Sequence, residues 1–213
     1  MNALHSGNVF GIPNIGIYDE KLLEFTADQI ANTIIEANKS FVPIRVGTAS
    51  KAAPGFCRNR RGDPTTDDEL TVTRIDTAAG DPLAVFVNFT AHPTYVNEKV
   101  MLVTAGWPGY LQREVETHLG GGITCLYSNG AEGDIGPTGG EGPSPYARGE
   151  DHGRKLSMHV MDLYASIETS ADVPFDFAVH TLELPPRTVP PALLEEAGPE
   201  YGITEENAKV LIE

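Results

Sequence analysis

Residues 83–94 read Leu83-Ala84-Val85-Phe86-Val87-Asn88-Phe89-Thr90-Ala91-His92-Pro93-Thr94. The first seven are almost continuously apolar, which predicts a fully buried strand. Proline cannot continue the ladder of a central strand, so this strand is expected to end at His92 and Pro93. A histidine held at the rim of a sheet suits a metal ligand, a general base or a structural role.

Helices and strands are expected to alternate on both sides of this segment. Residues 70–76 predict a half-buried strand, joined to 83–89 by a hairpin turn at 78–82. Strands alternating with helices predict an α/β fold, with helices layered over mixed, largely buried β-sheets. The other expected elements are an amphipathic helix at 19–39, a strand at 43–47, a helix at 108–119, a buried strand at 123–127, a long loop at 128–148, a helix at 150–167, a strand at 175–184 and an acidic helical tail from residue 204.

Charge and hydropathy narrow the classes of partner. The chain has 213 residues and a net charge of −15, which repels phosphate backbones and excludes nucleic acid as a partner. No apolar run reaches the roughly 18 to 20 residues that span a bilayer, so no transmembrane segment is expected. The first residues lack the pattern of a signal peptide, which predicts a soluble chain without an export signal and leaves the compartment unknown.

The chain has two cysteines, Cys57 and Cys125. Their spacing matches neither a metal-binding motif nor a redox motif, so we interpret them as free or buried thiols. A disulfide would require their Cα atoms to lie within about 7 Å, which the sequence leaves open.

Two further segments carry polar groups suited to chemistry. A second apolar strand leads into the glycine-rich turn Gly130-Ala131-Glu132-Gly133-Asp134-Ile135-Gly136-Pro137. There Asp134 can act as an acceptor, as an orienting partner of a histidine, or simply as a turn residue. Arg58, Arg60 and Arg61 cluster on a loop, where they can bind a carboxylate or amide oxygen or balance local negative charge.

Five segments, in this order, resemble those of the neutral ceramidase family. They are Ala3-Leu4-His5-Ser6-Gly7, Asn59-Arg60-Arg61, Ala91-His92-Pro93-Thr94, Thr104-Ala105-Gly106-Trp107-Pro108-Gly109 and Gly133-Asp134-Ile135-Gly136-Pro137. The resemblance implies a zinc-dependent hydrolase that cleaves an amide bond, as in N-acylsphingosine deacylation, with a lipid or small-molecule amide as substrate. It also implies that residues 1–213 form a single partial domain, the middle of the family's catalytic domain. A partial domain would expose sheet edges and apolar surface, so a homo-oligomer is possible.

The same resemblance assigns roles to individual residues. It implies that His92 is a zinc ligand, that His5 and Arg60 are active-site residues and that Asp134 orients the site. The substrate would contact Arg60, Gly133 and Gly136. A second family zinc ligand is replaced by Ala3, and the remaining ligands lie beyond Glu213, so this chain alone is expected to bind zinc weakly.

Two positions depart from the family pattern. Gly136 stands where the family carries a serine proposed as nucleophile, and glycine has no side chain to attack a carbonyl. Zinc-activated water would not need that serine. Gly106 stands where relatives have an aspartate, a possible orienting acceptor. An alternative hypothesis is therefore a catalytically inactive homologue that serves as a binding or scaffold module.

Overall fold

The computed structural model describes residues 19–97, 103–174, 176–183 and 192. The chain divides into two compact units. One unit is Val42–Phe175, and the other combines Met1–Phe41 with Asp176–Glu213. The predicted extent of one partial domain, residues 1–213, remains a prediction.

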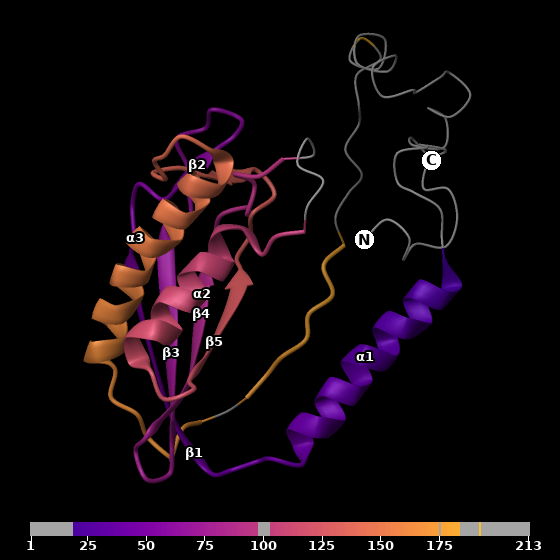
Figure 1. Cartoon of the computed structure of the whole chain (residues 1–213), viewed down its shortest axis with the longest axis vertical. Coiled ribbons are helices and arrows are strands. Elements are labelled where there is room, and N and C mark those ends of the chain that lie inside the picture. Colours follow the sequence, from indigo (N-terminus) through magenta and orange to yellow (C-terminus); the bar gives the residue numbers. More distant parts are fainter. Residues whose placement is uncertain (1–18, 98–102, 175, 184–191, 193–213) are drawn as a thin grey trace. The chain divides into compact units, whose positions relative to one another are not determined.

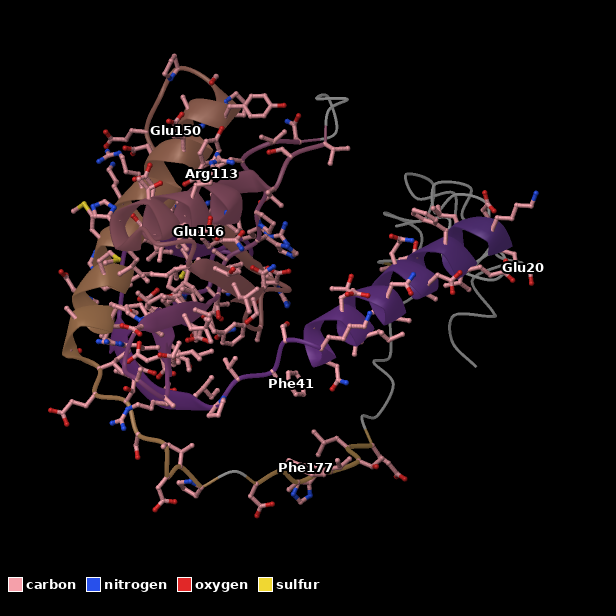
Figure 2. All side chains as sticks on the ribbon, turned by 60° about the horizontal axis from the view of Figure 1, so that its bottom comes forward. Glu20, Phe41, Arg113, Glu116, Glu150 and Phe177 are labelled. Atoms are coloured by element: carbon pink, nitrogen blue, oxygen red, sulfur yellow. The ribbon has the colours of Figure 1, made fainter. Side chains whose placement is uncertain are left out.

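Helix α1 (Glu20–Asn38) confirms the helix expected at 19–39. It begins at Asp19, whose side-chain oxygen accepts hydrogen bonds from the backbone N–H groups of Lys21 and Leu22. This N-cap satisfies donors that have no partner inside the helix. None of its residues is buried. Side chains project from all sides of this helix, whose first residue, Glu20, is labelled in Figure 2.

The unit Val42–Phe175 contains a mixed four-stranded sheet, a two-stranded sheet and two helices. The larger sheet has the order β1-β3-β4-β5, and the smaller one pairs β2 with β6. The elements are β1 (Ile44–Ala52), β2 (Cys57–Asn59), β3 (Glu69–Thr77), β4 (Pro82–Phe89), α2 (Gly106–Leu119), β5 (Thr124–Asn129), β6 (Ile135–Pro137) and α3 (Pro145–Ser166).

The larger sheet is antiparallel at one side and parallel at the other. Strands β1, β3 and β4 pair antiparallel, whereas β4 and β5 pair in parallel. The hairpin expected at 78–82 is confirmed, because Thr77 N–H bonds to Asp81 O at 2.8 Å and Gly80 N–H bonds to Thr77 O at 2.9 Å. The parallel pair is joined through α2, because a parallel connection needs a crossover.

Helices α2 and α3 lie side by side over one face of the larger sheet (Figure 1). Side chains fill the space between helices and strands (Figure 2), with Trp107, Phe89 and Leu111 fully enclosed. A β-carbon at Gly153 of α3 would lie 2.7 Å from the Trp107 carbonyl oxygen. Glycine therefore allows the two helix backbones to approach closely, which sets the position of the start of α2.

The expectation that β4 and β5 are fully buried was wrong. In β4, Val85, Val87 and Phe89 are buried, but Phe86 on the opposite face is 37% exposed. In β5 only Cys125 is buried, and Leu126 is 50% exposed. Within this unit the helices cover a single face, so apolar runs that resemble doubly covered strands contribute only alternate residues to the core.

The long loop expected at 128–148 is shorter than predicted. Strand β6 lies inside it, and α3 already begins at Pro145, where the Ser144 side chain accepts a hydrogen bond from Ala147 N–H. Three-residue strands carry no periodic signal, so pairing with the distant β2 was not predictable. The strand expected at 175–184 was also wrong, because residues 176–183 have no regular secondary structure. The acidic tail lies outside the described residues.

Both cysteines are free and buried, as expected for structural thiols. Cys57 donates a hydrogen bond to the Asp68 carboxylate at 3.0 Å. Glu116 of α2, labelled in Figure 2, accepts a hydrogen bond from the Cys125 N–H at 2.9 Å and so ties the helix to β5. None of the helices in the described part of the chain is long and apolar enough to span a membrane.

Candidate active site

The candidate site begins where the parallel strands β4 and β5 end. Phe89 and Asn129 pair in register at the last position of these strands. His92 follows Phe89 by three residues and Glu132 follows Asn129 by three, so both leave the sheet at one rim. His92 Nδ1 lies 3.3 Å from Glu132 Oε1. The carboxyl ends of parallel strands are a common place for ligand binding.

The backbone of His92 is held on both sides. Its N–H donates to the Ile135 carbonyl at 3.2 Å, and its own carbonyl accepts a hydrogen bond from Trp107 Nε1 at 3.3 Å. Trp107 is fully buried at the start of α2, so it is a rigid anchor. The imidazole itself is 30% exposed. A fixed backbone with an accessible ring is the arrangement that a ligand or a base requires.

The Glu132 carboxylate lies partly inside the protein. Its side chain is 23% exposed, and Oε2 is buried without a hydrogen-bond partner among the described residues. Nearby Tyr127 has its pKa raised, first by burial and then by the negative charge of Glu132. The Tyr127 hydroxyl donates elsewhere, to the Phe89 carbonyl at 2.7 Å. Nδ1 of His92 therefore faces a carboxylate that lies partly inside the protein and has one oxygen without a partner among the described residues.

The second half of the site is made by the small β2–β6 sheet. Arg58 pairs with Gly136 and Asn59 with Ile135. Immediately after β2, Arg60 N–H donates to the Asp134 carbonyl at 2.7 Å, and Arg60 Nη2 donates to the Gly133 carbonyl at 2.9 Å. The glycine-rich turn therefore holds both the backbone of Arg60, through the Asp134 carbonyl, and its guanidinium group, through the Gly133 carbonyl.

Two open depressions lie on this turn. One of about 570 Å³ is lined by Arg60, Arg61, Gly133 and Asp134. The other, of about 380 Å³, is lined by Asn59, Asp63, Thr65, Thr66, Asp67, Ala131, Asp134 and Ile135. Asp134 borders both, and its Oδ2 accepts a hydrogen bond from Asn59 Nδ2 at 3.0 Å.

Gly136 and Gly106 occupy confined positions. A β-carbon on Gly136 would lie 3.2 Å from Cγ and Cδ of Arg60, so the arginine stem takes the space of a side chain there. Gly106 has φ of 60°, and a β-carbon on it would lie 3.1 Å from Cβ of Pro93. An L-residue at position 106 would be strained and would press on the turn that carries His92.

The sequence and the fold were compared with those of known proteins. No model of a known protein family matches the chain. The chain is 26% identical over 151 residues to Neutral ceramidase A of Dictyostelium discoideum, a match that covers 61% of this chain and 21% of that protein. It superposes on a crystal structure of neutral ceramidase from Pseudomonas aeruginosa with a TM-score of 0.57 and 19% identity, and on a structure titled "Ceramidase complexed with C2" with a TM-score of 0.56 and 19% identity.

The chain is similar in sequence to part of one neutral ceramidase and in fold to part of another. Each superposition covers 70% of this chain and 26% of the solved chain, so the chain spans about a quarter of the length of those proteins. The structural likeness establishes the α/β fold that the sequence predicted, with helices over a mixed sheet.

The fold brings most of the expected site residues together. Arg60, Gly133, Asp134 and Gly136 meet at the β2–β6 turn, and His92 joins them through its hydrogen bond to Ile135. His5 lies outside the described residues. The catalytic and binding roles of all these residues remain predictions.

Glu132 was not among the predicted site residues, although it lies in the same glycine-rich turn. The carboxylate beside His92 belongs to Glu132, whereas the Asp134 carboxylate contacts Asn59. The pair of His92 and Glu132 could have been found by counting residues from the ends of the two strands. In parallel strands, residues at the same distance beyond a paired position lie close together. That register was unknown before the structure.

Across the residues that the structure describes, no group of three or more His, Cys, Asp and Glu side chains could hold a metal ion. A catalytic zinc usually takes three protein ligands, so the described residues supply at most part of a site. That part suits a metal, because a ligating histidine commonly directs its other ring nitrogen to a carboxylate, as Glu132 allows.

Proposed function

We propose that the ceramidase-like domain is part of a zinc-dependent hydrolase that cleaves an amide bond in a lipid or small-molecule substrate, N-acylsphingosine or a related amide or ester. The observation that carries this proposal is the turn from Glu132 to Ile135. The Glu132 side chain and Ile135 carbonyl contact His92, while the Gly133 and Asp134 carbonyls bind Arg60. One short turn therefore joins a candidate metal ligand to a candidate substrate-binding group.

In this proposal His92 supplies one zinc ligand, and the other ligands come from residues outside the described part of the chain. Zinc, when bound, would lower the pKa of a coordinated water to about 7 and polarise the substrate carbonyl. His92 is suited to the role because its backbone is held at both its N–H and its carbonyl. A ligand on a fixed backbone loses little freedom on binding.

Arg60 would grip the substrate. Its Nη2 is committed to the Gly133 carbonyl, which leaves other guanidinium N–H groups to face the 570 Å³ depression. These donors suit an amide carbonyl or the carboxylate that hydrolysis produces. Asp134 would orient the site through its backbone carbonyl, which accepts from Arg60 N–H, and through its bond to Asn59.

The nucleophile in this proposal is water. Gly136 has no side chain, so covalent catalysis by a serine at this position is excluded. The Arg60 stem fills the space beside it.

The test uses the intact gene product. Zinc content is measured by mass spectrometry, and amide hydrolysis is measured with a short-chain fluorescent ceramide. His92→Ala is expected to lose both the bound zinc and at least a hundredfold in activity. The matched control, His118→Ala, removes an exposed histidine at the end of α2 and should change neither.

Two outcomes would contradict the proposal. Full activity in His92→Ala would refute the metal assignment. A wild-type protein that binds no zinc and hydrolyses no amide would favour the alternative, a binding or scaffold module.

A further inference from the structure

We propose that Glu132 is a positioning residue for His92: its carboxylate accepts the hydrogen on Nδ1 and thereby leaves the lone pair on Nε2, the nitrogen available to a ligand. The role of Nε2 as a zinc ligand rests on the proposed function. The tautomer itself does not, because it is a property of the protein without metal.

The first support is the way the fold creates the contact. Phe89 and Asn129 end two strands in register, and equal offsets bring His92 Nδ1 to 3.3 Å from Glu132 Oε1. The turn is closed by a hydrogen bond from Ile135 N–H to the Glu132 carbonyl at 3.0 Å. Ile135 then accepts from His92 N–H. The side-chain contact is thus reinforced by a backbone connection between the same two segments.

The second support is the environment of the carboxylate. Glu132 Oε2 is buried without a partner among the described residues, so water solvates this carboxylate only in part. The neighbouring Tyr127 hydroxyl donates to the Phe89 carbonyl instead. A proton on Nδ1 offers the carboxylate a donor, whereas the other tautomer would set a nitrogen lone pair against it. Electrostatics therefore favours the Nδ1–H form.

The third support is the position of the other acid in the turn. Asp134 also lies close to the site, but its Oδ2 is occupied by Asn59 and its main-chain carbonyl by Arg60. Each acid of the turn thus serves a different half of the site. Glu132 orients the histidine, and Asp134 supports the arginine segment.

The experiment reads the tautomer directly. Protein labelled with ¹⁵N-histidine is stripped of metal, and long-range ¹H–¹⁵N correlations of His92 are recorded at mildly alkaline pH, where imidazoles are neutral. The wild type is expected to show Nδ1–H. Glu132→Ala should shift His92 towards a mixture with Nε2–H, whereas Asp134→Asn should leave the tautomer unchanged.

A second readout is zinc affinity, which should fall about 10- to 100-fold in Glu132→Ala, the usual cost of losing such a partner. Glu132→Asp should recover part of it. If Glu132→Ala does not fold, the similarly sized Glu132→Met, which has no oxygen to accept the hydrogen on Nδ1, replaces it, and the dispersion of the amide spectrum verifies the fold.

The failure of this inference can be distinguished from that of the proposed function. A wild-type His92 in the Nε2–H form, or an unchanged tautomer in Glu132→Ala or Glu132→Met, overturns the positioning role even if the protein is an active hydrolase. A tautomer that follows Glu132 in a protein without zinc or activity supports the positioning role and removes the hydrolase.

Discussion

The side chain of Arg60 occupies the space next to Gly136. A β-carbon at position 136 would lie 3.2 Å from both Cγ and Cδ of the arginine. Such a distance is tighter than most real contacts of a β-carbon, so the stem would have to move by a few tenths of an ångström. Glycine at position 136 and the present orientation of Arg60 are therefore coupled.

Gly136→Ser tests this coupling. Gly136 is not among the glycines with positive φ, so its backbone accepts serine. We expect a loss of about 1 kcal/mol in the free energy of unfolding, the mild end of overpacking costs. Turnover should change little, since water is the proposed nucleophile. Denaturant unfolding and amide hydrolysis measure the two effects.

Gly136→Ala is the matched control for that variant, because it adds the β-carbon without the hydroxyl. We expect the two variants to behave alike. A serine variant that raises turnover while the alanine variant does not would show that the hydroxyl acts as a nucleophile.

His152 predicts a pH dependence of stability. It is fully buried, its Nδ1 lies 2.8 Å from the Thr138 carbonyl and 3.1 Å from the Tyr95 hydroxyl, and burial lowers its pKa to about 4. Between pH 4 and an unfolded value of about 6.5, only the unfolded state binds the proton. The contribution of neutral His152 to the free energy of unfolding is therefore complete above about pH 6.5. It is lost as the pH falls, by up to about 1.4 kcal/mol per pH unit.

Urea unfolding from pH 4 to 7 measures that slope, and His152→Gln should flatten it. Asp151 does not affect this comparison. The hydrogen bond with Lys155 is the main cause that lowers its pKa to about 2, so its contribution to stability is lost only below its ordinary pKa of 3.8. His118→Gln, at an exposed position, is the control. An equal slope in wild type and His152→Gln would show that the buried imidazole is not the source.

The two cysteines should be unreactive in the folded protein. Burial, followed by the hydrogen bond to Asp68, raises the pKa of Cys57 to about 12. Burial, followed by the charge of Glu116, raises the pKa of Cys125 to about 12. Thiolate is the reactive form, so almost none exists at neutral pH. A thiol reagent should label neither cysteine in the native protein and both after denaturation. Rapid labelling of one equivalent without denaturant would contradict the burial described here.

The segments that could be predicted share a strong local signal. The hairpin between β3 and β4, helix α1 and helix α2 were all expected, since apolar periodicity, glycine and proline mark them within one stretch of chain. The segments that were missed depend on distant partners. Strand β6 exists because it pairs with β2, and residues 176–183 alternate like a strand but adopt no regular structure. Alternation shows that a segment could pair, not that a partner strand is there.

The residues at the rim could be read from the sequence. They are His92 after one apolar strand, a glycine-rich acidic turn after another, Arg60 on a loop, and a glycine without a hydroxyl at position 136. Which of these groups contact one another became known from the folded arrangement of the strands. The parallel register of β4 and β5 sets Glu132, rather than Asp134, against His92, and the β2–β6 pairing brings Arg60 to Gly133. The physical reason is that local chain geometry extends over a few residues, whereas strand register is set by side chains that pack across the sheet.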